Sequence, residues 1–170
     1  MAKVGLFYGT QTGATKTEAE AIRQEFGGDS VVELIDVSKI EASDLDRFEY
    51  IIIGCPTWNA GELQSDWVTF YNELDNIDFT GKKVAYFGPG DQVGYPDNFV
   101  DAIGILEKKI SQQGGTTVGY WPAEGYEFTA SKGLRDGKFV GLALDEENQP
   151  DLTRERIKTW VARLKDEFGL

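Results

Sequence analysis

The feature that most constrains the fold is a set of short apolar segments, spaced along the chain and bounded by turn residues. They lie at Val4–Tyr8, Val31–Ile35, Tyr50–Gly54, Val84–Gly88 and Thr117–Trp121, and the last can resume at Phe139–Leu144. Most of them are almost continuously apolar, which is typical of strands that are covered on both faces of a parallel sheet. The pattern therefore predicts a sheet of five buried parallel strands.

The segments between these strands carry apolar residues at helical spacing, which gives each segment one apolar face. The three clearest faces are Ala19, Ile22 and Phe26; Phe99, Ala102, Ile103, Leu106 and Ile110; and Ile157, Trp160, Val161, Leu164 and Phe168. Strands and helices that alternate through short connections imply right-handed crossovers. We therefore expect an α/β fold, with a doubly wound parallel sheet and helices on both faces. Ligands bind such sheets at the carboxyl ends of the strands.

The length of 170 residues and the hydrophobic content of 41% suit one compact domain that spans residues 1–170. One polar segment departs from the alternation. Residues Pro122–Lys138, "PAEGYEFTASKGLRDGK", interrupt the last strand and do not lead to a helix. We interpret this segment as a loop inserted into the last strand.

The charge balance narrows the function. Seventeen basic and 29 acidic residues give a net charge of -12, which opposes binding to nucleic acid or anionic membranes and suits basic protein partners; solubility alone is the alternative. Without a long apolar stretch near the start, we expect no signal peptide or membrane span and a cytoplasmic protein. The chain has one cysteine and no histidine, which excludes an internal disulfide, Ser-His-Asp or Cys-His catalysis and histidine-based metal sites.

The loop after the first strand, "GTQTGAT" at residues 9–15, precedes the first helix. The unpaired N–H groups at a helix start and the helix dipole favour an anion there. The spacing of Gly9 and Gly13 fits neither a nucleoside triphosphate loop nor a dinucleotide fingerprint. A monophosphate bound by amides and threonine hydroxyls remains, and the alternative is that Thr12 merely caps the helix.

Two more loops follow strands at the same edge of the predicted sheet. One, residues 55–61, contains Trp58, and the other, residues 88–95, contains Tyr95. Two aromatic rings at one edge can enclose a flat heterocycle by offset stacking. Together with a phosphate site, they indicate a mononucleotide with a planar ring, and flavin mononucleotide (FMN) fits best.

These three loops also carry recognisable motifs. They are T-x-T-G-x-T at residues 10–15, P-T-W-N-x-G-E-L at 56–63 and G-x-G-D-x-x-x-Y at 88–95. In these motifs, and over essentially its whole length, the chain resembles the flavodoxin family. The late insertion is similar to that of the long-chain members from cyanobacteria and algae. The resemblance implies the strand order 2-1-3-4-5, with FMN bound non-covalently between strands 1 and 3.

The resemblance also implies a function and its partners. The protein would be a low-potential one-electron carrier and not an enzyme. From its 20 glycines and the lack of an obvious exposed apolar helix face, we also expect a monomer. It would replace ferredoxin under iron limitation and carry electrons from photosystem I to ferredoxin–NADP reductase.

The resemblance assigns roles residue by residue. The phosphate would be bound by Thr10, Gln11, Thr12, Gly13, Ala14 and Thr15. The inner face and N5 edge of the flavin would lie against Thr57, Trp58, Asn59, Ala60 and Gly61. The outer face and pyrimidine edge would contact Gly90, Asp91, Tyr95 and Asn98. The chain departs from the family pattern at Pro89 and Val100, which receive no binding role.

Acidic residues in or just after the flavin loops would disfavour extra negative charge on the ring and face a basic partner. They are Glu62, Asp66, Asp91, Asp97 and Asp101, and the alternative for each is a solvated surface charge. Cys55 precedes a flavin loop, but apolar neighbours and the lack of a nearby basic group favour core packing over a redox thiol. Asp145-Glu146-Glu147 matches no calcium loop, so we interpret it as a charged turn and expect no metal site.

Two other function classes stay open on the residues alone. A flavin enzyme such as a quinone or nitro reductase would need a substrate cavity over the exposed ring, which Trp58 and Tyr95 are expected to close. A receiver-type signalling module would need paired acidic residues near the end of the first strand. The first strand, "VGLFYGT", supplies none.

Overall fold

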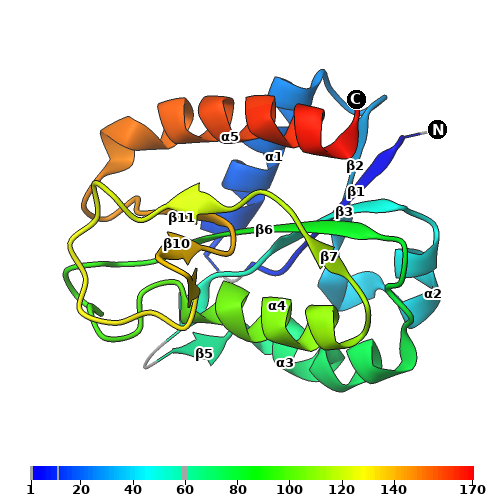
Figure 1. Ribbon diagram of the computed structural model, residues 1–170, viewed down its shortest axis with the longest axis horizontal. Helices are drawn as coiled ribbons and strands as arrows, with labels where there is room; N and C mark the ends of the chain where they lie inside the picture. The colour runs from blue at the N-terminus through cyan, green and yellow to red at the C-terminus, as the bar shows by residue number, and fades with distance from the viewer. Residues whose placement is uncertain (1, 11, 59–60) are drawn as a thin grey trace.

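The computed structural model describes residues 2–10, 12–58 and 61–170. Its centre is a parallel sheet with the strand order β2-β1-β3-β6-β11 (Figure 1). The strands are β1 (Val4–Tyr8), β2 (Val32–Asp36), β3 (Tyr50–Gly54), β6 (Lys83–Pro89) and β11 (Leu142–Leu144). In chain order this is the predicted order 2-1-3-4-5, so the doubly wound α/β fold is confirmed.

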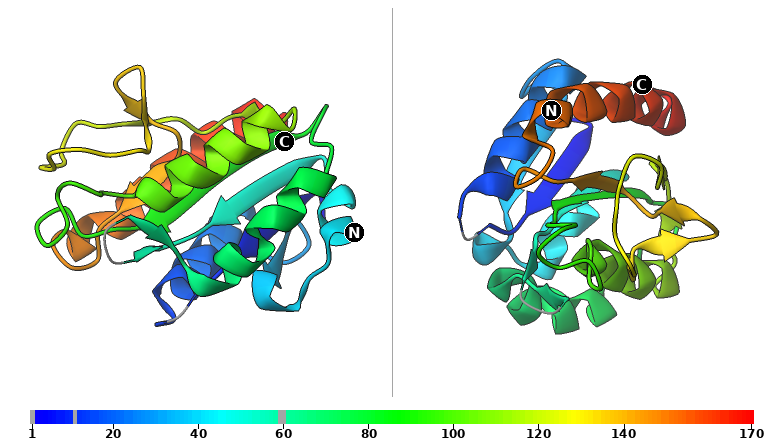
Figure 2. Two further views of the ribbon diagram at one scale, coloured as in Figure 1. Left: turned by 90° about the horizontal axis from the view of Figure 1, so that it is seen from below. Right: turned by 90° about the vertical axis from the view of Figure 1, so that its left-hand side faces the viewer.

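Helices cover both faces of this sheet. Figures 1 and 2 show α1 and α5 together on one face and α3 and α4 on the other, with α2 beside the sheet near one end. The helices are α1 (Ala14–Phe26), α2 (Ala42–Asp46), α3 (Ser65–Tyr71), α4 (Asp101–Gln112) and α5 (Thr153–Phe168). The three apolar faces read from the sequence lie on α1, α4 and α5, so these predictions are confirmed, except that Phe99 precedes α4.

Burial explains why the strands are so apolar. Every residue of β1 is buried, and so are the last four residues of β3. In the register of the sheet, Leu6 pairs with Leu34 on β2 and with Ile52 on β3. Helices on both faces leave few positions on these central strands for polar side chains.

The predicted fifth strand, Thr117–Trp121, is not one strand, and this prediction is wrong. The segment contributes the end of β7 (Thr116–Thr117), which pairs with β6, and the start of β8 (Trp121–Pro122). Between them Gly119 has a φ of 78°, a conformation that side chains with a Cβ avoid. The continuation at residues 139–144 instead supplies β11, the edge strand beside β6.

The inserted segment has structure of its own. It contains β9 (Leu134–Arg135) and the start of β10 (Lys138–Phe139), which form a small antiparallel sheet with β8 in the order β8-β10-β9. Its side chains Tyr126 and Phe128 pack on the ring of Phe99, with centroid distances of 5.6 and 5.5 Å, and Phe139, which directly follows the insertion, lies 5.7 Å from the same ring. The insertion therefore covers the segment that leads into α4.

The remaining elements are short. An antiparallel pair, β4 (Thr57–Trp58) and β5 (Glu62–Leu63), follows β3. Three 3-10 turns are η1 (Val37–Lys39), η2 (Asn72–Asn76) and η3 (Pro150–Leu152). The sequence patterns did not predict α2 and α3, because five- and seven-residue helices are too short to display a helical period clearly.

Candidate functional site

Loops that follow β1, β3, β6 and β11 enclose a cavity of about 270 Å³ at the carboxyl edge of the sheet. Its lining residues are Thr12, Ala14, Pro56, Thr57, Trp58, Pro89, Gly90, Asp91, Tyr95, Asn98, Glu146 and Glu147. The structure thus brings together residues from all three predicted loops. The lining contains no basic side chain among the described residues.

Twelve of the fifteen predicted site residues belong to the described ranges. Eight of them line the cavity, namely Thr12, Ala14, Thr57, Trp58, Gly90, Asp91, Tyr95 and Asn98. Four belong to the same loops without lining it, namely Thr10, Gly13, Thr15 and Gly61. Three, Gln11, Asn59 and Ala60, lie outside the described residues.

The first loop leads into the start of α1. Gly13 is the residue before the helix and has a φ of 90°, which glycine adopts without strain. Its N–H donates to Thr10 Oγ1 at 3.0 Å. Thr12 is exposed and does not cap the helix, so the alternative of a Thr12 cap is wrong. The hydroxyl of Thr15 is buried and has no hydrogen-bond partner among the described residues, which leaves a donor for a ligand.

The second loop contains Thr57 and Trp58. Thr57 Oγ1 accepts a hydrogen bond of 3.0 Å from the N–H of Ala102 at the start of α4. Trp58 is half-buried, and its indole Nε1 has no partner in the part of the chain that the structure describes. Gly61, with a φ of 88°, lies so close to α4 that a Cβ there would be 2.6 Å from Asp101 Oδ2. The loop is therefore fixed against α4, and an indole N–H remains available at the cavity.

The third loop is organised by its own acidic residue. Asp91 Oδ1 accepts hydrogen bonds from the N–H of Gly94 at 2.7 Å, the side chain of Asn148 at 2.8 Å and the N–H of Val93 at 3.1 Å. These hydrogen bonds, those of Gly94 and Asn148 first, lower the pKa of the Asp91 carboxyl. Tyr95 lies in the cavity wall with 51% of its surface exposed, so its ring is available for stacking.

The two positions that depart from the family pattern have different environments. Pro89 lines the cavity although no role was predicted for it. Val100 is fully buried and has a φ of 47°, which is rare for a β-branched residue. It precedes α4 without a side-chain cap, and the Thr57 hydroxyl accepts a first-turn N–H instead. Val100 therefore packs in the core at the start of α4 and does not line the cavity.

Sequence reasoning missed the contribution of the turn after β11. Glu146 and Glu147 line the cavity, while Asp145 is buried and accepts hydrogen bonds from Gln92 at 3.1 and 2.8 Å. The signal that could have revealed them is position: the turn follows a strand of the parallel sheet, as the other three loops do.

Gln64, which is buried and caps α3, was missed because glutamine is an unusual cap residue.

Two smaller expectations can be compared with the structure. Cys55 is fully buried, and burial raises the pKa of its thiol to about 12, so its assignment to the core is confirmed. Asp101 is 1% exposed and accepts the N–H of Lys132 at 2.7 Å. Its predicted place on a charged docking surface is therefore wrong, because it holds the insertion against α4.

The arrangement combines three chemical features. The start of α1 offers N–H groups and the unpartnered Thr15 hydroxyl to an anion. Trp58 and Tyr95 provide two aromatic rings, and Asp91, Glu146 and Glu147 add negative charge to the wall. A ligand with an anionic end and a planar ring suits these features, and addition of a negative charge to that ring is opposed by the carboxylates.

Comparison with known proteins identifies relatives over the whole chain. The family model described as flavodoxin matches residues 6–160. A flavodoxin of Synechococcus elongatus is 68% identical over 170 residues and covers all of both chains. A flavodoxin of Nostoc is 70% identical over 168 residues, which are 99% of this chain and 98% of that one.

A solved structure is also similar. The flavodoxin of Fusobacterium nucleatum bound to flavin mononucleotide superimposes with a TM-score of 0.92 at 34% identity, over 98% of this chain and 99% of that chain.

Across the ranges that the structure describes, none of the helices has the length and apolar character needed to cross a membrane.

Proposed function

Because this chain belongs to the flavodoxin family, we propose that its cavity binds FMN and that the protein transfers electrons one at a time. The observation that carries the proposal is that the start of α1, two aromatic rings and three acidic side chains line one cavity at the carboxyl edge of the sheet. As a flavodoxin the chain is an electron carrier and not an enzyme.

The described residues fit a bound FMN. The phosphate would lie at the start of α1, where the Thr15 hydroxyl is buried without a partner. Because no described residue of the lining is basic, hydrogen bonds from amides and hydroxyls would stabilise the phosphate in place of a salt bridge. Trp58 and Tyr95 would stack on the two faces of the flavin ring. We retain the whole predicted set of binding residues as part of this proposal.

FMN supplies the redox chemistry, and the protein sets how readily the ring is reduced. A carboxylate about 10 Å from the ring, at an effective dielectric constant of about 40, opposes an added negative charge by roughly 0.8 kcal/mol. About 1.4 kcal/mol corresponds to about 59 mV for one electron, so each such carboxylate lowers the potential by roughly 35 mV. Asp91, Glu146 and Glu147 in the wall thus favour a low potential.

The first experiment is an anaerobic reductive titration of the FMN-loaded protein, with absorbance recorded from the near ultraviolet to the red. We expect two separate one-electron steps, the second at low potential. A single two-electron step would contradict a one-electron carrier. A purified protein that contains no FMN and binds none would contradict the cofactor assignment.

A finer role follows from the resemblance and the charge. We propose that the protein, as one FMN-binding domain and a cytoplasmic monomer, replaces ferredoxin between photosystem I and ferredoxin–NADP reductase under iron limitation. The net charge of -12 supports docking to basic faces of these partners. The test is NADP⁺ reduction by illuminated photosystem I and the reductase without ferredoxin. We expect NADPH only when the FMN-loaded protein is present, and no NADPH in a mixture that works with ferredoxin would overturn this role.

A further inference from the structure

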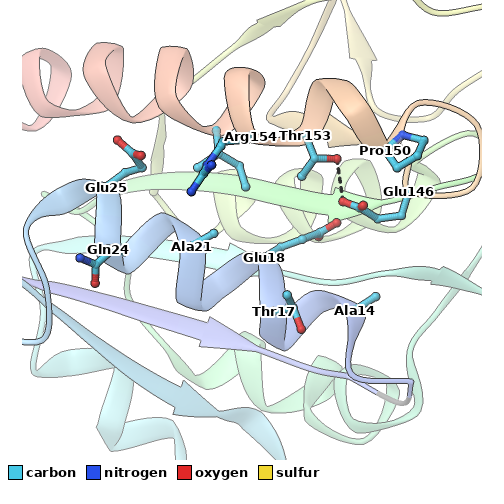
Figure 3. Close-up of a pocket in the computed structure, with 11 residues that line it drawn as sticks. Ala14, Thr17, Glu18, Ala21, Gln24, Glu25, Glu146, Pro150, Thr153 and Arg154 are labelled. Carbon is cyan, nitrogen blue, oxygen red and sulfur yellow. Dashed lines mark hydrogen bonds between the residues drawn. The ribbon is translucent and has the colours of Figure 1, made fainter.

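A second cavity of about 490 Å³ lies between α1 and α5 (Figure 3). It shares Ala14 and Glu146 with the wall of the cofactor cavity. Its other lining residues come from the two helices and from η3, and none of them lines the cofactor cavity. It is therefore a neighbouring site with its own chemistry.

The unusual residue of this cavity is Glu18. It is 3% exposed, and within the described ranges neither of its carboxyl oxygens accepts a hydrogen bond. Figure 3 shows its carboxyl group pointing toward that of Glu146, which accepts a hydrogen bond of 2.7 Å from the Thr153 hydroxyl. A buried carboxylate without a donor destabilises a fold, so ionised Glu18 is a site for a donor that the described residues do not supply.

The environment of Glu18 also disfavours its ionised form. Burial raises the pKa of Glu18 well above its usual value. The charge of Glu146 raises this pKa further, and so does a hydrogen bond that protonated Glu18 can donate to Glu146. The other charged groups that line the cavity are Glu25 on α1 and Arg154 on α5.

The lining limits the class of ligand. Two facing carboxyl groups repel an anion. The described residues contain no group of three or more histidine, cysteine or acidic side chains that could hold a metal ion. The rest of the wall includes Ala21, Pro150 and Ile157, which suit a short apolar chain. A primary ammonium group has three N–H donors, enough to satisfy both oxygens of Glu18 and one of Glu146.

We propose that the cavity between α1 and α5 binds a small organic ammonium ion, with its N–H donors on the carboxyl groups of Glu18 and Glu146. Its apolar chain lies along the helices beside Ala21 and Ile157. Arg154 projects from α5 toward Ala21 in Figure 3, so the positive group of the ligand is confined to the Glu18 end of the cavity.

The test is isothermal titration calorimetry of the FMN-saturated protein with n-butylammonium chloride, so that the cofactor cavity is already filled. We expect one saturable site per chain and no binding of n-butanol, which has the same apolar chain without the charge. Because the cation favours ionised Glu18, binding should release a proton, measured in buffers of different ionisation enthalpy. The affinity should therefore fall as the pH is lowered.

Variants locate the site. Glu18→Gln keeps the shape of the side chain and removes its charge, and it should weaken butylammonium binding at least tenfold, about the effect of losing a hydrogen bond to a charged group. Glu20→Gln is the matched control, because it removes one negative charge from an exposed position of the same helix. It should change the affinity less than about twofold.

A third variant tests the apolar part of the site. Ala21→Leu at the exposed edge of α1 should obstruct the apolar chain and weaken binding without a change of charge. The proposal is overturned if butylammonium shows no saturable binding. It is also overturned if Glu18→Gln has no effect on binding, or if it weakens binding no more than Glu20→Gln does. If Glu18→Gln does not fold, unchanged binding in Ala21→Leu overturns the proposal.

Discussion

Two threonine hydroxyls in the first turn of α1 differ in their environments. Thr17 Oγ1 donates to the carbonyl oxygen of Gly13 at 3.0 Å, within the helix. Thr15 Oγ1 is buried and has no partner among the described residues. Of these two hydroxyls, that of Thr15 is therefore the one that can donate to a bound phosphate, and its removal is a single-residue test of the phosphate site.

We predict that Thr15→Val weakens FMN binding about tenfold, because one hydrogen bond to a charged acceptor is lost while the shape of the side chain is kept. The cofactor-free protein should be no less stable, since the variant removes an unpartnered buried polar atom. Quenching of FMN fluorescence measures the affinity, and Thr17→Val is the control, with less than about a twofold effect expected. Equal losses in both variants would contradict this assignment.

Glu18 allows a prediction about stability and pH. Its pKa is raised in the folded protein, chiefly by burial, so folding favours the protonated form. The raised pKa lowers the free energy of unfolding only above the pKa that Glu18 has in the unfolded chain. This loss of stability grows as the pH rises from that value toward the pKa in the folded protein. Glu18→Gln should therefore stabilise the cofactor-free protein against urea at pH 7, and the gain should shrink as the pH approaches 4. A gain that does not depend on pH would contradict the buried-charge explanation, and Glu20→Gln should show no comparable gain.

At the scale of elements, the turn between β9 and β10 shows how a local signal operates inside the insertion. Asp136 and Gly137 have φ values of 54° and 82°, so both residues are left-handed, as in a two-residue type I′ hairpin. The pair Asp-Gly is the preferred sequence for such a turn. This signal was present within the segment that we interpreted as a loop.

We predict that Gly137→Ala destabilises the protein by about 1–2 kcal/mol, since alanine is strained at a left-handed φ. Urea unfolding measures the loss. Lys138→Ala, at the next position, which is also exposed, should change the free energy of unfolding by less than about 0.5 kcal/mol. If the two variants lose the same stability, the turn conformation is not the cause.

The sequence predicted the elements whose patterns are long and regular. β1 and β3 have the predicted bounds, and the apolar faces of α1, α4 and α5 were found because they extend over two or more turns. The interruption of the last strand by the insertion was predicted, but the bounds of its halves β7 and β11 were not, since these are set by pairing with β6. Such a contact depends on tertiary structure and leaves no local pattern.

The candidate site was predictable to a similar extent. The loops after the first, third and fourth strands were found from their position and residue types, whereas Glu146 and Glu147 were tested only against the spacing of a calcium loop and assigned to a charged turn. The left-handed conformation of Val100 could not be predicted, because valine disfavours it and only the surrounding packing imposes it. Local sequence preferences thus predict where a loop begins, whereas its backbone conformation and its place in the cavity wall depend on tertiary contacts.

For the whole molecule, the excess of 29 acidic over 17 basic residues produces a strong negative potential. Such a potential attracts a basic partner over a distance comparable with the Debye length, which falls from about 30 Å at 0.01 M to about 8 Å at 0.15 M ionic strength. The association rate should therefore depend on salt, whatever the detailed contacts of the complex are.

We predict that the rate at which the reduced protein donates electrons to a basic c-type cytochrome falls at least tenfold between low salt and 0.3 M salt, as electrostatic steering is screened. Ferricyanide is the matched control: it is an anionic oxidant, so its reaction should become faster as salt screens the repulsion. Stopped-flow absorbance follows both reactions, with the same reduced protein and at the same series of salt concentrations. Opposite salt dependences would assign the effect to the charge of the protein, because the flavin and its potential are the same in both experiments. If the two rates change in the same direction, salt acts on the cofactor or on the fold, and the acidic surface has no part in steering.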